Sequence, residues 1–356
     1  MDSVKISGVK LEAVYACVPD VILDNEKECA GLFGAGVENL IKSTGIKKRY
    51  VVSNGVSSLD LCCTAAQKLF ADTGINKNDV GAVICVTFTP EYLMPCNAVA
   101  AQERLGLGNG VAAFDIAIAC SGYCYGIWVA SMMAKSMKKK VLLLNGDVQS
   151  VYTSKLDKST APVLSDAGTA TVIAPCTDGD TWTFAFYSDG SGREKLYIPA
   201  GGSKGRIDEK AIRLNEMEDG SQIRDVDIHM DGFAIFKFVA QDVSKLIKSF
   251  MSENDIAEED VDAFIPHQAN IYMIEQLTKK LKISSEKLWK SGDEYGNPAS
   301  SSVPLTIASQ KDKHFSEGKK RMLLSGFGGG LSASIGYLTM DASVPCKAFQ
   351  YERKEQ

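Results

Sequence analysis

The chain has 356 residues, more than a single hydrophobic core usually serves, and a hydrophobic content of 45% excludes general disorder. The net charge of -5 gives no support for nucleic-acid binding. No apolar run approaches the ~18 residues of a membrane span, and the start of the chain has no signal-peptide pattern. We therefore expect a globular protein of two lobes that binds neither nucleic acid nor membrane.

In chain order, apolar periodicity and turn residues predict alternating strands and helices. The chain opens with a strand that ends near Pro19. Ser57 or Ser58 is a suitable N-cap for a helix that continues to Phe70. Further helices are expected at 25–40, 97–105, 125–133, 225–250 and 271–281, and further strands at 80–87, 114–118, 141–144, 170–174 and 263–265.

Two segments of the first half recur in the second half at one common spacing. Residues 79–84 match 260–265, and residues 138–145 match 319–326. Two matches at the same spacing indicate a duplicated α/β unit and a pseudo-twofold molecule. We expect an N-terminal half at 1–176 and a C-terminal half at 177–356, with a bridging segment of strands and exposed loops at about 177–221.

The ten cysteines do not form a metal-binding or redox framework. No CxxC pair occurs, and the chain has only three histidines, so neither a zinc site nor any other metal site is expected. With no export signal, reduced thiols in the cytoplasm are the simplest account.

Cys120 is the candidate nucleophile, because it stands where an apolar, strand-like run gives way to a predicted helix. Backbone N–H groups and the helix dipole at such a junction favour a thiolate, and we expect the thiol pKa to fall from ~8.5 towards neutrality. Taken alone, a buried structural cysteine is the commoner case.

Two polar residues later in the chain are placed for the same site. His267 follows a predicted strand within the sequence PHQAN at 266–270, and a histidine at the end of a strand can face a cleft. Asn297 lies in GNPASSS at 296–302 and precedes a proline, so a position in mid-helix is disfavoured. Taken alone, His267 is as readily an ordinary loop residue, and Asn297 is more often a turn residue.

Together these motifs strongly resemble the β-ketoacyl-acyl carrier protein synthase III family. The resemblance implies a thiolase-like α/β fold of two similar halves in a layered αβαβα arrangement, assembled as a homodimer. It covers nearly the whole chain, through Cys120, PHQAN, GNPASSS and the matching segments at 44–46, 165–168, 197–203 and 326–331.

The resemblance implies a condensing acyltransferase of fatty-acid-like or specialised metabolite biosynthesis. Cys120 takes the acyl group as a thioester, and malonyl-acyl carrier protein then condenses with loss of CO2 to give a 3-oxoacyl thioester. His267, through Nε2, and the Asn297 side-chain amide stabilise the negative charge that decarboxylation develops. The backbone N–H groups of Cys120 and Gly329 form the oxyanion hole. Acyl-CoA or acyl carrier protein thioesters are the substrates, and no cofactor is expected.

Further positions carry the family's partner contacts. Lys237, Lys279 and Lys280 correspond to the basic residues that bind the acidic carrier protein, although each is equally compatible with plain solvated surface. Met94 replaces the aromatic residue that bounds the acyl pocket of the partner subunit, and a flexible methionine there favours a longer or odd-shaped acyl group.

Three positions depart from the family pattern. Asn39 and Ser43 replace the tryptophan and arginine that grip the coenzyme A nucleotide, and Tyr272 replaces an arginine that contacts carrier protein. Losing a stacking surface and cations weakens binding of acyl-CoA. We therefore expect a specialised relative whose first acyl donor is not ordinary acetyl-CoA.

Two other functions remain open. Some relatives transfer the acyl group to an alcohol or amine without decarboxylation, and Asn297 favours condensation without excluding transfer. A non-catalytic partner subunit of a ketosynthase pair is the other, although such subunits usually lose the cysteine. The sequence does not identify the acyl donor, the product or the pathway.

Overall fold

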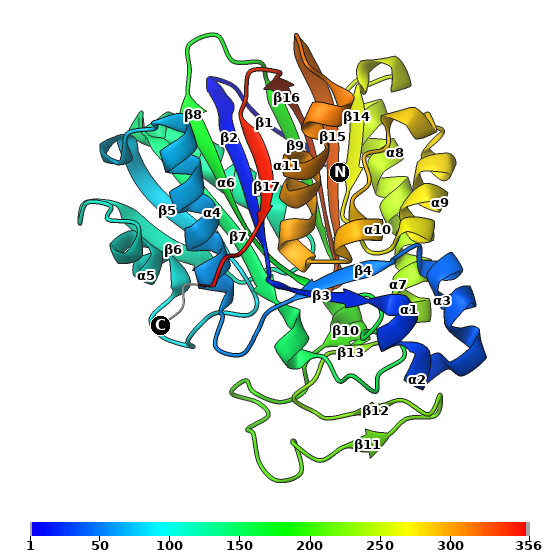
Figure 1. Cartoon of the computed structure of the whole chain (residues 1–356). Coiled ribbons are helices and arrows are strands. Elements are labelled where there is room, and N and C mark those ends of the chain that lie inside the picture. Colours follow the sequence, from blue (N-terminus) through cyan, green and yellow to red (C-terminus); the bar gives the residue numbers. More distant parts are fainter. Residues whose placement is uncertain (1, 354–356) are drawn as a thin grey trace.

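The structure, a computed structural model, describes residues 2–353. Two twisted sheets stand face to face, with helices outside each sheet and between them (Figure 1). The six-stranded sheet has the order β17 (Cys346–Gln350), β2 (Val9–Val18), β8 (Asp166–Pro175), β7 (Lys140–Val148), β5 (Val80–Val86) and β6 (Ala112–Ile116). The five-stranded sheet has the order β1 (Val4–Ile6), β9 (Trp182–Ser188), β16 (Ser332–Asp341), β15 (Lys319–Gly328) and β14 (Ala263–Pro266).

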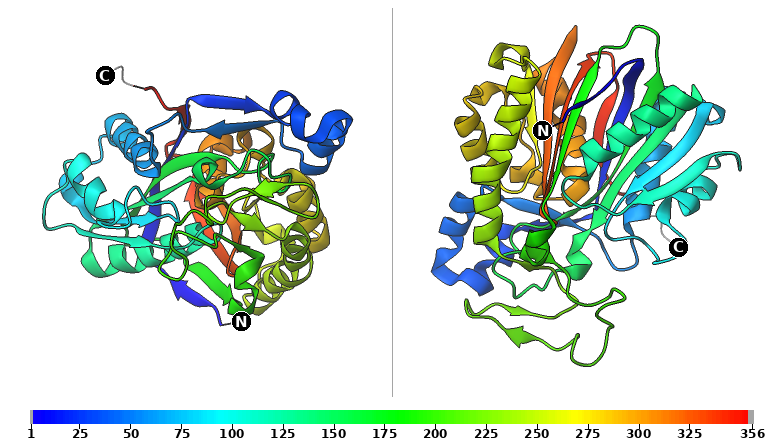
Figure 2. Two further views of the ribbon diagram at one scale, coloured as in Figure 1. Left: turned by 90° about the horizontal axis from the view of Figure 1, so that it is seen from below. Right: turned by 180° about the vertical axis from the view of Figure 1, so that it is seen from behind.

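The helices complete a five-layer arrangement. The outer face of the six-stranded sheet is covered by α4 (Ser58–Thr73) and α5 (Asn97–Arg104), and the outer face of the five-stranded sheet by α8 (Ser244–Glu253) and α9 (Ile271–Leu281) (Figures 1 and 2). The central layer is α6 (Gly122–Met137) and α11 (Ser302–His314). Shorter helices are α1 (Asn25–Glu28), α2 (Ala30–Phe33), α3 (Val37–Thr44), α7 (Gly232–Phe238) and α10 (Gly292–Tyr295).

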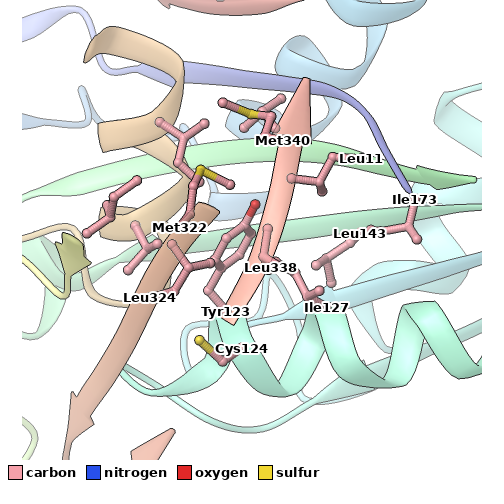
Figure 3. Close-up of a cluster of buried hydrophobic side chains, with 14 of the residues drawn as sticks. Leu11, Tyr123, Cys124, Ile127, Leu143, Ile173, Met322, Leu324, Leu338 and Met340 are labelled. Carbon is pink, nitrogen blue, oxygen red and sulfur yellow. The ribbon is translucent and has the colours of Figure 1, made fainter. Parts of the chain in front are cut away.

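The largest core lies between the sheets, around α6. Two glycines allow this helix to lie close to the six-stranded sheet: a Cβ on Gly122 would be 2.4 Å from Val86 Cγ1, and one on Gly126 would be 2.7 Å from Leu143 Cδ1. The other side of α6 meets β15 and β16 (Figure 3). The buried side chains shown are Leu11, Tyr123, Cys124, Ile127, Leu143, Ile173, Met322, Leu324, Leu338 and Met340.

The segments matched in the sequence repeat form equivalent strands. The first pair of matched segments forms β5 and β14, and the second pair forms β7 and β15. β5 pairs in parallel with β7, and β14 pairs in parallel with β15. Each of these strands then pairs antiparallel with the next, β8 and β16. The division at 176 and 177 stays a prediction, and two edge strands cross it: β1 joins the sheet of the C-terminal half, and β17 that of the N-terminal half.

Three antiparallel strand pairs extend from the layered body. They pair β3 (Val21–Asp24) with β4 (Lys48–Val51), β10 (Leu196–Tyr197) with β13 (His229–Met230), and β11 (Asn215–Glu216) with β12 (Gln222–Ile223). The third projects below the body in Figure 1.

The helix predicted over 225–250 begins later than expected. Asp231 caps it by accepting a hydrogen bond from Ala234 N at 2.9 Å, and the preceding residues form β13. It then runs through a π-helical segment, Val239–Val243, into α8. Phe233, in its first turn, is 79% exposed.

Candidate active site

Cys120 lies in a short loop between the end of β6 and the start of α6, as predicted from the sequence. Its neighbour Ser121 ties this loop to the other half of the molecule. Ser121 Oγ shares a 2.8 Å hydrogen bond with Ser332 Oγ, and Ser121 O accepts one from Ser334 Oγ at 2.7 Å. Cys120 is therefore held at the junction of the two halves, with its side chain 8% exposed.

The expected fall in the pKa of Cys120 is wrong for the resting site. Burial raises the thiol pKa to about 12, and the negative charge of Asp147 adds to that effect. Desolvation penalises the thiolate more than the start of α6 compensates. At rest Cys120 is therefore a thiol, and the sulfur would have to lose its proton to act as a nucleophile.

His267 stands at the end of β14, where its backbone N–H donates to Ser325 O at 2.7 Å. Ring atom Nδ1 is 2.7 Å from Ser302 Oγ, which also accepts a hydrogen bond from Gln268 N at 3.4 Å. The Ser302 hydroxyl can therefore donate to Nδ1, which favours the tautomer with its proton on Nε2. Burial lowers the His267 pKa to about 3, against the opposing effect of the Ala299 backbone, so the ring is neutral near pH 7.

Asn297 is fixed mainly by main-chain contacts with the N-terminal half. Its N–H donates to Val163 O at 3.0 Å, and its carbonyl oxygen accepts from Ser165 N at 3.1 Å. Side-chain Oδ1 accepts from Ala299 N at 3.1 Å. These bonds leave Nδ2 as the free donor of the amide, with no hydrogen-bond partner among residues 2–353.

These three side chains line one cavity of about 470 Å³. Gly328 and Gly329 line it as well, and a Cβ on Gly328 would be 2.7 Å from Cys120 Cβ. Glycine is therefore required where this loop meets Cys120. The remaining walls are mostly apolar, and include Phe88, Leu164, Leu196, Ile198, Ile228, Ile235 and Met273.

Family profiles match the two segments that carry these residues. "3-Oxoacyl-[acyl-carrier-protein (ACP)] synthase III" matches residues 114–190, and the corresponding C-terminal profile matches 251–340. The β-ketoacyl-[acyl-carrier-protein] synthase III of Campylobacter concisus is 32% identical over 90% of this chain and 94% of its own length. That of Campylobacter fetus is 33% identical over the same shares. The chain belongs to this synthase III family.

Solved structures of the family have the same architecture. The 3-oxoacyl-(acyl-carrier protein) synthase of Burkholderia xenovorans superposes with a TM-score of 0.91 at 30% identity, covering 98% of this chain and 99% of that one. A priming β-ketosynthase from the R1128 polyketide pathway shares the fold, with a TM-score of 0.79 at 22% identity. The layered αβαβα arrangement is thus the thiolase-like fold, and the chain is an acyltransferase of the condensing type.

Other residues singled out in the sequence lie outside the cavity. Lys237, Lys279 and Lys280 are exposed on α7 and α9. Met94 is 86% exposed in a loop and does not reach the cavity of its own chain. Asn39 is exposed on α3, as are Ser43 on that helix and Tyr272 on α9.

Sequence reasoning missed two polar residues, Asp147 and Gln149. Asp147 lies near the end of β7 and is fully buried. Its carboxylate accepts hydrogen bonds from Ser300 Oγ at 2.6 Å and from Phe88 N at 2.9 Å. Gln149 donates through Nε2 to Asn297 O at 2.7 Å. The sequence does contain a signal for both residues, because they come shortly after an apolar run that predicts a strand. Functional side chains often lie in the loops where strands end.

All ten cysteines are free thiols. Within residues 2–353, no cluster of three or more histidine, cysteine, aspartate or glutamate side chains is arranged to hold a metal ion. Nor does any described helix have the length and apolar character needed to cross a membrane.

The buried His267 should weaken the fold in mild acid. Below pH ~6.5 the unfolded imidazole binds a proton, whereas the folded one stays neutral down to about 3. Because the unfolded state then binds more protons, the free energy of unfolding falls as the pH drops through this window. Between pH 7.5 and 5, we expect urea unfolding to show wild type losing about 2 kcal/mol more than His267→Gln.

The buried carboxyl group of Asp166 also titrates in this pH range, but it does not affect the difference between the two proteins. Burial raises its pKa to about 6, so its effect has the opposite sign, but it is present in both proteins. Equal losses in wild type and His267→Gln would show that His267 does not carry the acid sensitivity.

Proposed function

We propose that the protein accepts an acyl group on Cys120 and condenses it with malonyl-acyl carrier protein to give a 3-oxoacyl thioester and CO2. The observation that carries this proposal is the gathering of Cys120, His267 and Asn297 in one cavity. Two neutral donors beside a nucleophilic thiol suit a reaction that first forms a thioester and then an enolate. No cofactor is needed for either step.

In the proposed first step, Cys120 sulfur attacks the donor thioester, and the released carrier thiol takes the proton. In the second, malonyl thioester loses CO2 and its bonding electrons pass to the thioester enolate. Nε2 of His267 and Nδ2 of Asn297 donate hydrogen bonds to that enolate oxygen. The enolate carbon attacks the acyl-cysteine, and the Cys120 and Gly329 N–H groups bind the resulting oxyanion. Its collapse expels the Cys120 thiolate, which takes a proton from solvent to restore the thiol.

The mass of the product tests this function against simple acyl transfer. With malonyl-acyl carrier protein and an acyl donor, condensation lengthens the acyl group by two carbons and releases CO2. Transfer to an alcohol or amine gives an ester or amide of unchanged acyl length. Turnover without CO2 would overturn the proposal, and persistence of function in Cys120→Ala would support a non-catalytic subunit.

The carrier protein's proposed docking site is a groove beside the cavity. The groove, about 450 Å³, lies between the π-helical segment and α9, and Phe236, Tyr272 and Leu277 line it. Met273 lines both the groove and the cavity. Two cations border it, Lys279 and Lys280. An apolar floor with a basic rim suits an acidic carrier that presents an apolar helix.

Reversing the charge on this rim should weaken carrier binding. Lys279→Glu with Lys280→Glu is expected to raise KM for malonyl-acyl carrier protein about tenfold, with a smaller effect at high salt. Lys5→Glu with Lys10→Glu, on β1 and β2, is the matched control. An unchanged KM, or an equal rise with a malonyl thioester that has no carrier protein, would place docking elsewhere.

We also propose a homodimer in the cytoplasm. The edge strand β6 is only partly buried, and a second copy can cover it. The exposed Met94 would then reach the partner's acyl pocket, as the family pattern implies. The free state of all ten cysteines supports a reducing compartment.

The proposed donor is a thioester other than acetyl-CoA. Neither Asn39 nor Ser43 supplies a stacking ring or a cation, and the Lys158 ammonium at the cavity donates to Asp219 O at 2.6 Å. Titrating acetyl-CoA and acyl-carrier donors while following Cys120 by intact mass checks this. Fast acylation at micromolar acetyl-CoA would overturn it.

A further inference from the structure

Gln149 is a polar residue of the cavity lining that the proposed chemistry does not use. Gln149 follows β7 and is 3% exposed. Most other side chains that line the cavity are apolar, among them Phe88, Leu164 and Leu196. The few polar groups in a mostly apolar pocket usually orient a ligand and select for it.

Hydrogen bonds fix the orientation of the Gln149 amide. Nε2 donates to Asn297 O at 2.7 Å and to Ser165 O at 2.9 Å. Both partners are carbonyl oxygens, which cannot donate, so only the amide nitrogen can face them. Oε1 must then turn away from both, and no other described residue donates a hydrogen bond to it.

We propose that Gln149 selects the acyl donor by accepting a hydrogen bond through Oε1 from a hydroxyl group on the acyl chain. This inference rests on the proposed function, since the ligand is the acyl group that Cys120 receives. Gln149 bonds directly to the main chain of Asn297, which lines the same cavity as Cys120. The hydroxyl therefore belongs close to the thioester carbonyl, on the second or third carbon of the acyl group.

Gln149 could serve only to hold the Asn297 loop in place, but that role involves only one end of its side-chain amide. Anchoring Asn297 O and Ser165 O uses only the two N–H bonds of Nε2. An unsubstituted alkyl chain would displace water from Oε1 and leave the acceptor without a partner. A hydroxyl group replaces that water, so the site discriminates against the analogue that lacks it. The acyl transfer itself is unchanged, with Cys120 gaining the acyl group and the carrier thiol leaving with the proton.

Paired donors of equal chain length test the proposal. Wild-type protein is mixed with pantetheine thioesters of butyrate, 2-hydroxybutyrate or 3-hydroxybutyrate, and acylation of Cys120 is followed by intact mass in single turnover. At least one hydroxybutyryl donor should react about tenfold faster than butyryl. Butyryl reacting as fast as both hydroxy analogues would overturn the inference.

Two variants locate the selection. Gln149→Met keeps the length of the side chain but removes Oε1, and should bring the ratio of the two rates close to one. Leu196→Met repacks the same wall with Gln149 intact and should keep the wild-type ratio. A ratio that survives Gln149→Met would also overturn the inference. No acylation by any donor would instead count against the proposed function.

Discussion

Replacing Cys120 with alanine is expected to abolish acylation, with no mass increase on the protein from any thioester donor. The variant removes the atom that forms the covalent bond, so the overall rate should fall by about 10³-fold or more. Intact mass spectrometry after mixing with donor measures the first effect, and CO2 release from malonyl-acyl carrier protein measures the second.

Cys124→Ala is the matched control, because Cys124 lies in the first turn of α6, just after the Cys120 loop, and is also buried. Cys124 does not line the cavity, so the variant should still gain the acyl mass. Acylation of Cys120→Ala at the wild-type rate would mean that another of the ten cysteines is the nucleophile.

Asn297→Ala and His267→Ala are expected to separate the two half-reactions. Each should still acylate Cys120, because thioester exchange does not require an enolate donor. Each should lose decarboxylation by about 10²- to 10³-fold, the usual cost of removing one such donor. Acylation by intact mass and CO2 release from the malonyl thioester, measured on the same preparation, give the two rates.

An exposed asparagine, Asn109, provides the control substitution for Asn297→Ala. Asn297→Asp sharpens the comparison, since it keeps the side-chain shape and the acceptor for Ala299 N but removes the Nδ2 donor. Decarboxylation at the wild-type rate in Asn297→Ala would disprove the role of this amide, and slow acylation would indicate a disturbed loop instead.

Much of the fold could be predicted because the buried strands are continuous apolar runs and recur at one spacing. β7, β8 and β14 include the whole of the expected segments, and β5 covers residues 80–86 of the expected 80–87. The helix at 225–250 was misplaced because its apolar periodicity begins before Asp231, while the chain up to that cap forms β13. Local pattern cannot show that β13 pairs with β10.

The positions of Cys120, His267 and Asn297 were accessible because each follows or precedes a recognisable strand or helix. Their electrostatics were not, because desolvation depends on what the rest of the chain places over them. The Cys120 thiol shows this: the local junction predicts a lowered pKa, and burial together with Asp147 raises it. The position of Gln149 after an apolar strand was visible in the sequence, but its hydrogen bond to the carbonyl of Asn297 was not, because the two residues are distant in sequence.

The exchange of edge strands has a consequence for assembly of the chain. Suppose the chain were cut between residues 176 and 177. The C-terminal fragment would lack β1, the first strand of the chain, and the N-terminal fragment would lack β17, the last strand. Neither fragment could complete its own sheet or hide the exposed strand edge. The two ends of the polypeptide thus join the two halves, and the fold is complete only when β1 and β17 have each paired with the sheet of the other half.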